Sequence, residues 1–278
     1  MRRAFVLFGA SLALGAALPL VLPVGRPAQR LRVASENSCL GAARVPAHIA
    51  PLPHFSRAVG EEGRVRIVAI GSSSTEGVGA SSPAENYPSQ LREMLAKALP
   101  AEAIEVVNLG VGGETAAETA ARLREEIPRL HPDLVLWQVG ANDGITGVPP
   151  EKYEATLRDA LDFLKKTDTD VVLVGMQWTR RLAALPNYLP IRDVTARVAR
   201  DAGVALVSRY DAMRQYGGAA GREEFTGPDH LHLNDKGYRC LAEQIAVTLS
   251  HAIDDNVISR VSSAQRLDRN PARSKPLD

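Results

Sequence analysis

The stretch from Val65 to Gly79 reads VRIVAIGSSSTEGVG and decides the expected fold. Its first part, Val65–Ile70, is mostly apolar and β-branched and lacks the polar alternation of a strand with one wet face. This pattern is typical of a parallel strand that is covered on both faces. A glycine and three serines follow at once, so the strand is expected to end in a tight polar turn before a helix.

Short runs of the same kind recur along the chain, at Ile104–Leu109, Leu134–Val139, Val171–Met176 and Val204–Ser208. Amphipathic segments separate them, with apolar stripes at helical spacing at Tyr153, Leu157, Leu161 and Leu164, and at Tyr238, Leu241, Ile245 and Leu249. Five strand–helix alternations predict an α/β fold, a three-layer α/β/α sandwich around a doubly wound parallel sheet. Ligands of such folds bind beyond the carboxyl ends of the strands.

Composition excludes several classes of protein. The 278 residues carry a formal net charge of +1, with 45% hydrophobic and 23% charged residues. A net charge so close to zero lacks the basic excess that is typical of nucleic-acid-binding proteins. The apolar content is too high for a disordered chain. Two cysteines are too few for a disulfide-dense miniprotein or a four-thiolate metal site.

The ends of the chain differ from its centre. Arg2 and Arg3 precede an uncharged apolar run of 21 residues, 4–24, so residues 1–25 are expected to be a signal peptide or an amino-terminal membrane anchor. A buried helix is the alternative. Residues 26–63 form a Pro- and Ala-rich lead-in, 64–253 one globular domain, and 254–278 a polar tail that we expect to be disordered. The protein is therefore expected to be exported: periplasmic, anchored facing outward, or secreted.

The serine-rich loop has three interpretations. A phosphate-binding P-loop fails because five residues separate Gly71 from Gly77 and Val78 stands where lysine is needed. A dinucleotide fingerprint fails because Ser82 occupies the third glycine position. A nucleophilic serine on a strand-to-helix turn fits better, although a serine that merely caps the helix has the same pattern.

A serine nucleophile needs a base, and the candidates are His48, His54, His131, His230, His232 and His251. His232 follows Asp229 by three residues, a spacing that lets the carboxylate fold back onto the imidazole and fix its tautomer. A metal site made of Asp229, His230 and His232 is one alternative, and a structural histidine pair is another.

Two further loops can donate hydrogen bonds to a developing oxyanion. NLGVGGET at 108–115 ends the second expected strand, and its glycines can bring backbone N–H groups close to a ligand. VGAND at 139–143 ends the third and offers the Asn142 amide. Each loop alone is as typical of an ordinary turn or helix cap.

Taken in order, these four segments resemble the SGNH (GDSL-like) hydrolases, and the exported bacterial esterases among them. The segments that carry the resemblance are 71–74, 108–115, 140–143 and 229–232, which span nearly the whole domain. The resemblance implies a five-stranded parallel sheet. It also implies the catalytic residues Ser73, Asp229 and His232, with an oxyanion hole from the N–H groups of Ser73 and Gly113 and the Asn142 side chain.

The sequence departs from the family beside the nucleophile. The family commonly has Asp before its serine and Leu or Ile after it, whereas this chain has Ser72 and Ser74. Three consecutive serines make the assignment depend on register, and Ser73 is chosen by counting from Gly71.

The expected activity is hydrolysis of a carboxylic ester through an acyl-enzyme, with an O-acetyl group on a carbohydrate as one substrate class and no cofactor or metal. Lipase, lysophospholipase or thioesterase activity is the first alternative, and a non-catalytic carbohydrate-binding protein is an alternative of another class. Expected partners are a small acyl ester or an acylated glycan, and a membrane if residues 4–24 anchor the chain. The sequence leaves the oligomeric state open.

Export would allow the two cysteines to form a disulfide bond. Cys39 and Cys240 lie 201 positions apart, and in an oxidising compartment a bridge between them would tie the lead-in to the last helix. Two unrelated thiols are the alternative, because sequence does not show proximity.

Overall fold

The computed structural model describes residues 39, 48–99, 102–217 and 225–268. These residues form a parallel five-stranded sheet in the order β2-β1-β3-β4-β5. The strands are β1 (Arg64–Gly71), β2 (Ala103–Gly110), β3 (Leu134–Gln138), β4 (Asp170–Val174) and β5 (Ala205–Val207). The expected three-layer α/β/α sandwich and its five strands are confirmed.

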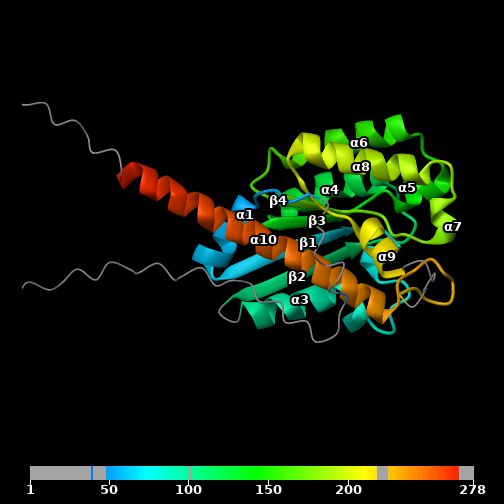
Figure 1. Ribbon diagram of the computed structural model, residues 1–278, viewed down its shortest axis with the longest axis horizontal. Helices are drawn as coiled ribbons and strands as arrows, with labels where there is room; N and C mark the ends of the chain where they lie inside the picture. Colours follow the sequence, from blue (N-terminus) through cyan, green and yellow to red (C-terminus); the bar gives the residue numbers. More distant parts are fainter. Residues whose placement is uncertain (1–38, 40–47, 100–101, 218–224, 269–278) are drawn as a thin grey trace, which may run out of the picture.

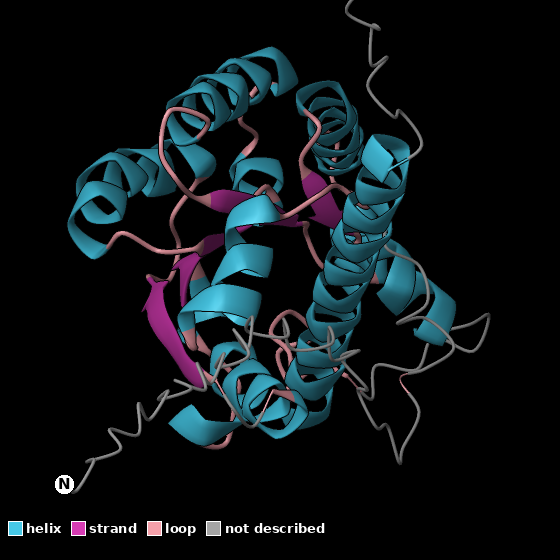
Figure 2. Ribbon diagram, turned by 90° about the vertical axis from the view of Figure 1, so that its left-hand side faces the viewer, coloured by secondary structure: helices cyan, strands magenta, loops and turns pink. Residues whose placement is uncertain are grey.

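Helices cover both faces of the sheet (Figures 1 and 2). One face packs against α1 (Pro53–Arg57), α3 (Tyr87–Ala98) and α10 (Asp235–Asp268), and the other against α4 (Ala116–Leu130), α6 (Pro150–Leu164) and α8 (Tyr188–Ala202). Shorter helices occupy the connections: α2 (Ser73–Glu76), α5 (Ala141–Thr146), α7 (Arg180–Ala183), α9 (Arg209–Gly217), a π-helix at Ala58–Glu62 and a 3-10 helix at Pro83–Glu85.

The strand pattern follows from this double cover. Ile67 and Ala69 of β1 pack on the α3 and α10 side, whereas Val68 and Ile70 pack on the α4 side, and all four are fully buried. Both side-chain directions of the strand therefore need apolar residues. The two predicted helical stripes on α6 and α10 are buried as well.

Parallel register brings the carboxyl ends of three strands together. Gly71 at the end of β1 is paired with Gly110 at the end of β2, and Ile70 is paired with Trp137 of β3. The loops that follow these strands therefore lie at one edge of the sheet, where such folds bind ligands.

The boundaries of the packed domain differ from the sequence prediction at the amino-terminal side. His48 forms an antiparallel bridge with Leu206, and Leu52 and Phe55 are buried against the sheet. The lead-in is thus part of the core at least from His48 onward. Its helix α1 is only five residues long, too short to show a helical period in the sequence.

The carboxyl side also differs. The domain was expected to end at residue 253, with a disordered tail after it, but α10 continues to Asp268. Residues 254–268 have scattered charges and no apolar period, so nothing in their pattern marks them as a helix. The rest of the expected tail, 269–278, lies outside the described residues.

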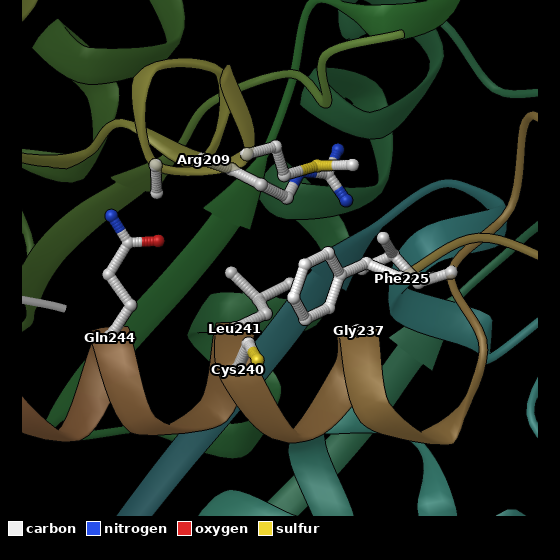
Figure 3. A pocket seen from close by; sticks show the side chains of 9 residues that line it. Arg209, Phe225, Gly237, Cys240, Leu241 and Gln244 are labelled. Carbon is white, nitrogen blue, oxygen red and sulfur yellow. The ribbon is translucent and has the colours of Figure 1, made fainter. Parts of the chain in front are cut away.

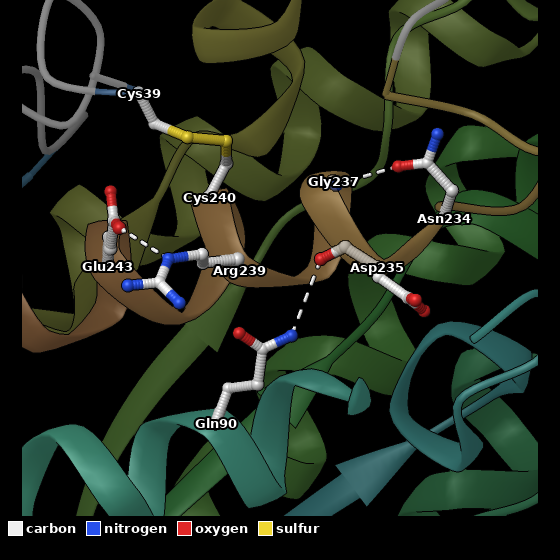
Figure 4. Close-up of a disulfide and its surroundings, with 8 residues drawn as sticks. All are labelled: Cys39, Gln90, Asn234, Asp235, Gly237, Arg239, Cys240 and Glu243. Atoms are coloured by element: carbon white, nitrogen blue, oxygen red, sulfur yellow. Dashed lines mark hydrogen bonds and ion pairs between the residues drawn. A yellow bond between two sulfur atoms is a disulfide. The ribbon is translucent and has the colours of Figure 1, made fainter. Parts of the chain in front are cut away.

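A disulfide joins Cys39 to Cys240 on α10, with their Cα atoms 5.4 Å apart (Figure 4). Phe225 packs beside the two cysteines in a small buried cluster. The bridge connects two points 201 positions apart and fastens the lead-in to the first turns of α10.

A buried arginine lies between α9 and α10. Arg209 faces the α10 residues Gly237, Leu241 and Gln244 across a cavity of about 10 Å³ (Figure 3). Its Nε donates to the Gly175 carbonyl at 3.1 Å and its Nη2 to Gln177 at 2.6 Å. Burial lowers the pKa of its guanidinium group.

No helix within the described ranges is long and apolar enough to cross a membrane. The apolar segment at 4–24, interpreted above as a signal peptide or anchor, lies outside those ranges.

Candidate functional site

Ser73 is the first residue of the short helix α2, directly after β1. The expected reason for Gly71 was freedom to turn, but Gly71 is not among the glycines with positive φ. Glycine is needed at this position because there is no room for a side chain. A Cβ there would lie 2.5 Å from Thr75 Oγ1 and 2.7 Å from Gln138 Cβ, so only glycine lets the turn close against β3.

Gln138, the last residue of β3, holds this turn in place. Its Oε1 accepts hydrogen bonds from the Ser72 N–H at 2.9 Å, the Ser72 hydroxyl at 3.0 Å and the Thr75 hydroxyl at 3.3 Å. All three residues are buried. The serine that replaces the common aspartate thus binds a neutral amide acceptor and does not point at the histidine.

The end of β2 supports α2 from the other side. A Cβ on Gly110 would lie 1.9 Å from the Glu76 N atom, so the helix packs directly on the strand backbone. Asn108 Nδ2 donates to the Thr75 carbonyl at 2.8 Å. Side chains from β2 and β3 therefore fix the helix that carries Ser73.

His232 lies between Ser73 and Asp229. Its Nε2 is 3.1 Å from Ser73 Oγ, and its Nδ1 is 2.6 Å from Asp229 Oδ2. The other carboxylate oxygen, Oδ1, accepts the backbone N–H groups of Leu231 and His232, each at 3.0 Å. The three-residue spacing thus lets one carboxylate oxygen of Asp229 bind the backbone of the loop while the other binds the imidazole.

The electrostatics of this arrangement favour an ionised Asp229. Burial alone would raise its pKa, but the Leu231 N–H and the contacts with His232 outweigh burial and lower the pKa to about 2. The Asp229 side chain is 50% exposed, and that of His232 is 18% exposed. The imidazole therefore faces a carboxylate that stays charged throughout the neutral range.

The serine loop and the histidine loop are tied together, although they are far apart in sequence. Asp235, at the start of α10, accepts the Ser81 N–H at 2.7 Å and the Ser81 hydroxyl at 2.6 Å. Tyr238 OH donates to the Val78 carbonyl at 2.7 Å. Gly79 has a φ of +93°, and a Cβ there would lie 2.5 Å from the Leu233 carbonyl oxygen. These contacts fix the separation of Ser73 and His232.

The two loops that were expected to donate hydrogen bonds to an oxyanion are hydrogen-bonded to each other. Asn142 Nδ2 donates to the Glu114 carbonyl at 2.7 Å, and the Asp143 carboxylate accepts the Ala116 N–H at 3.1 Å. Gly113 has a φ of +85°, which favours glycine, and its neighbour Gly112 would place a Cβ 4.0 Å from Ser73 Cβ. The glycine loop therefore lies between the serine and the asparagine.

This arrangement can perform nucleophilic catalysis without a metal ligand set. When a carboxylate, an imidazole and a hydroxyl are hydrogen-bonded in this order, the imidazole can accept the hydroxyl proton. The carboxylate orients the imidazole and stabilises the imidazolium ion that forms. Both ring nitrogens of His232 are hydrogen-bonded, Nδ1 to Asp229 and Nε2 to Ser73. No group of His, Cys, Asp or Glu within the described ranges has metal-binding geometry.

Sequence reasoning missed the residues that support the site. Gln138 lay within the expected strand Leu134–Val139 without a function of its own, Tyr238 was expected only as part of a helical stripe, and Asp235 was not singled out. Glu114 was also missed, although its carboxylate pairs with Arg122, whose Nε is 2.9 Å from Glu114 Oε1. Their functions depend on contacts across the sheet edge, which a single sequence does not display.

Comparison with known proteins gives a family for this architecture. A model described as the non-GDSL lipase-like family matches residues 38–255. The match begins well before residue 64, in agreement with the packed lead-in.

Individual relatives match shorter parts of this chain than the family model does. An arylesterase of Vibrio mimicus is 30% identical over 104 residues, which is 37% of this chain and 48% of the relative. Thioesterase 1/protease 1/lysophospholipase L1 of Escherichia coli K12 is 33% identical over 72 residues, 26% of this chain and 35% of the relative. The chain thus spans less than half the length of these curated relatives.

Among solved structures, a two-domain esterase active on acetylated mannans, co-crystallised with mannopentaose, superposes with a TM-score of 0.61. The two chains are 25% identical, and the match covers 75% of this chain and 56% of that one.

Proposed function

Because this chain belongs to the non-GDSL lipase-like family, of the SGNH type, we propose that it is a serine esterase that hydrolyses carboxylic esters through an acyl-enzyme. One observation carries the proposal: His232 bridges Ser73 and Asp229 with hydrogen-bond distances on both sides of its ring. A binding protein on the same scaffold would have no need for this line of three groups.

In the proposed mechanism Ser73 is the nucleophile and His232 the general base. Ser73 Oγ attacks the ester carbonyl carbon while its proton passes to His232 Nε2. The ionised Asp229 holds Nδ1–H, which fixes the tautomer and stabilises the imidazolium ion. His232 then protonates the leaving alcohol, and an activated water releases the acid in the same way.

The oxyanion is stabilised by the backbone N–H groups of Ser73 and Gly113 and by Asn142. One Asn142 N–H bonds the Glu114 carbonyl, which orients the amide and leaves the second N–H for the substrate. Donors fixed before the reaction need no reorganisation when the negative charge forms, which is why such groups lower the barrier.

The proposed substrate is a small acyl ester, with an acylated glycan as the alcohol component. The superposition with an esterase active on acetylated mannans supports this choice. Thioester or lysophospholipid hydrolysis, named for the Escherichia coli relative, is the competing activity.

A labelling experiment tests the mechanism directly. A fluorophosphonate probe is expected to add once per chain, at Ser73, and to abolish hydrolysis of p-nitrophenyl acetate. Kinetics with acyl chains of two to sixteen carbons, acetylated oligosaccharides and acyl thioesters then identify the substrate. An intact protein that takes no label and hydrolyses none of these would refute the proposal.

We also propose that the protein is exported. The support is the basic start and apolar run at 2–24 together with the disulfide, since such bonds persist in oxidising compartments. Cell fractionation and sequencing of the mature amino terminus distinguish a cleaved signal from a retained anchor. Recovery of the uncleaved chain in the cytosol, with free thiols, would contradict export.

A further inference from the structure

A second pocket, which we name the β5-edge pocket, opens at the same end of the sheet as Ser73. Its volume is about 350 Å³. It lies between the ends of β4 and β5 and the helices α8 and α9, and its lining includes Met176, Arg192, Asp193, Leu206, Tyr210 and Arg214. Pockets of roughly 300–1,000 Å³ are typical of small-molecule sites.

The position of the pocket relates it to the proposed active site. Ser73 follows β1, and the pocket borders β4 and β5, which lie two and three strands away in the sheet. Strands are spaced about 4.8 Å apart, so the pocket is displaced from Ser73 by roughly 10–14 Å along the edge. A ligand longer than one ring can reach both.

The charged side chains of the pocket balance. Two arginines, Arg192 and Arg214, and two aspartates, Asp193 and Asp211, line it, so the lining gives no net attraction to an anion or a cation. Arg192 donates from Nε and Nη2 to the same Asp193 oxygen, Oδ1, at 2.9 and 2.7 Å. Arg214 has no hydrogen-bond or ion-pair partner within the described part of the chain. The pocket thus offers a ligand the guanidinium donors of Arg214 and the second Asp193 carboxylate oxygen, Oδ2, as an acceptor.

The remaining lining is mixed, with Thr195 and Ser208 beside the apolar Met176, Ala196 and Leu206. Met176 and Leu206 form part of the wall, and the Arg192 guanidinium stacks on Tyr210, 4.8 Å from its ring centre. A neutral ligand with adjacent hydroxyl groups and an apolar C–H face suits such a wall. Guanidinium and carboxylate groups can each pair with two neighbouring hydroxyls, and the apolar face can pack on the aliphatic residues.

We propose that the β5-edge pocket is a sugar subsite, which binds a neutral sugar unit of a glycan whose acyl ester lies at Ser73. This inference rests on the proposed esterase function and adds the part of the substrate that determines specificity. Arg192, Asp193 and Arg214 bind the glycan and take no part in the chemistry.

Binding is tested separately from catalysis. The full chain carrying Ser73→Ala is titrated calorimetrically with mannotetraose, xylotetraose, cellotetraose and chitotetraose. At least one is expected to bind, and adding Arg214→Ala or Asp193→Ala is expected to weaken it tenfold or more. The matched control is Arg200→Ala, which removes an exposed arginine that lies outside the pocket on α8, the helix that carries Asp193; it should change binding less than twofold.

Kinetics with the otherwise unaltered protein complete the test. Arg214→Ala should raise KM for the acetylated form of the bound tetraose about tenfold and leave hydrolysis of p-nitrophenyl acetate unchanged. Failure of all four sugars to bind, or an effect no larger than that of Arg200→Ala, overturns the subsite. Loss of sugar binding in Arg214→Ala in a protein without any esterase activity would instead support the subsite and refute the proposed function.

Discussion

His232 Nε2 lies 3.1 Å from Ser73 Oγ, although 159 positions separate the two residues. The neighbouring serines are placed differently: Ser72 donates its hydroxyl to Gln138, and Ser74 is buried. The structure therefore distinguishes three consecutive serines that the sequence could separate only by counting from Gly71.

The first prediction concerns this register. Ser73→Ala should reduce kcat for p-nitrophenyl acetate by about 10⁴-fold or more, because the remaining groups cannot form the acyl-enzyme. Ser74→Ala should keep wild-type kcat, and Ser72→Ala should keep it within about tenfold, since the Ser72 N–H still bonds Gln138. Circular dichroism shows whether each variant is folded. Activity retained in Ser73→Ala would exclude it as the nucleophile.

The second prediction concerns the oxyanion donors. Asn142→Ala should lower kcat by about 10²–10³-fold with little change in KM, because the donor acts on charge that forms only in the transition state. Thr146→Ala is the control, since its hydroxyl bonds the Asn142 carbonyl and not the side-chain amide. Equal effects of the two substitutions would show that α5 matters only as a structural element.

The third prediction concerns the support of the serine turn. Gln138→Leu leaves the buried Ser72 N–H and two hydroxyls without their acceptor, which should cost about 2–4 kcal/mol of unfolding free energy. It should also lower kcat, because α2 is no longer held against β3. Urea unfolding and steady-state kinetics measure both.

Gln138→Glu is the matched comparison, because a carboxylate keeps an acceptor of the same shape. It should retain more activity than Gln138→Leu. If the leucine variant equals wild type in stability and kcat, then Gln138 is not a positioning residue.

The sheet was predictable because its strands have a local pattern, and the contact of Asp229 with His232 was predictable for the same reason. The run Val65–Ile70 is apolar in both side-chain directions except at Arg66, and Asp229 and His232 lie on one loop with a spacing that permits their contact. Such signals need no knowledge of distant contacts.

The supporting contacts were not predictable for the opposite reason. Gln138 reaches Ser72 across 66 positions, and Asp235 reaches Ser81 across 154. Glutamine at a strand end and aspartate in the first turn of a helix are ordinary residues at those places, so neither pattern distinguishes a support from a cap. Packing of Phe55 on the sheet was missed because α1 is too short to show a period.

The fourth prediction concerns pH. Burial raises the Asp143 pKa from its usual 3.8 to about 6, although backbone N–H groups, that of Ala116 first among them, act in the opposite direction. Folded Asp143 thus binds its proton more tightly than the unfolded chain. Its contribution to stability is complete below about pH 4 and is lost as the pH rises through 6.

Asp143→Asn cannot titrate, which provides the measurement. The unfolding free energy of wild type minus that of Asp143→Asn should fall by about 2–3 kcal/mol between pH 4 and pH 7. Burial raises the pKa of Asp170 to about 6 as well, but that residue is present in both proteins and cancels in the difference. A difference that is constant with pH would show that Asp143 titrates normally.

The last prediction concerns the disulfide. Replacing both Cys39 and Cys240 by alanine should lower the unfolding free energy by roughly 2–5 kcal/mol, because the bridge closes a long loop and restricts the unfolded chain. The site should keep its kcat, since neither cysteine contacts Ser73, Asp229 or His232. Dithiothreitol should destabilise wild type by the same amount and leave the double variant unchanged, which separates loss of the bond from loss of packing around Phe225. If both thiols of the unreduced protein react with iodoacetamide, the bond is absent and the lead-in is held by its apolar contacts alone.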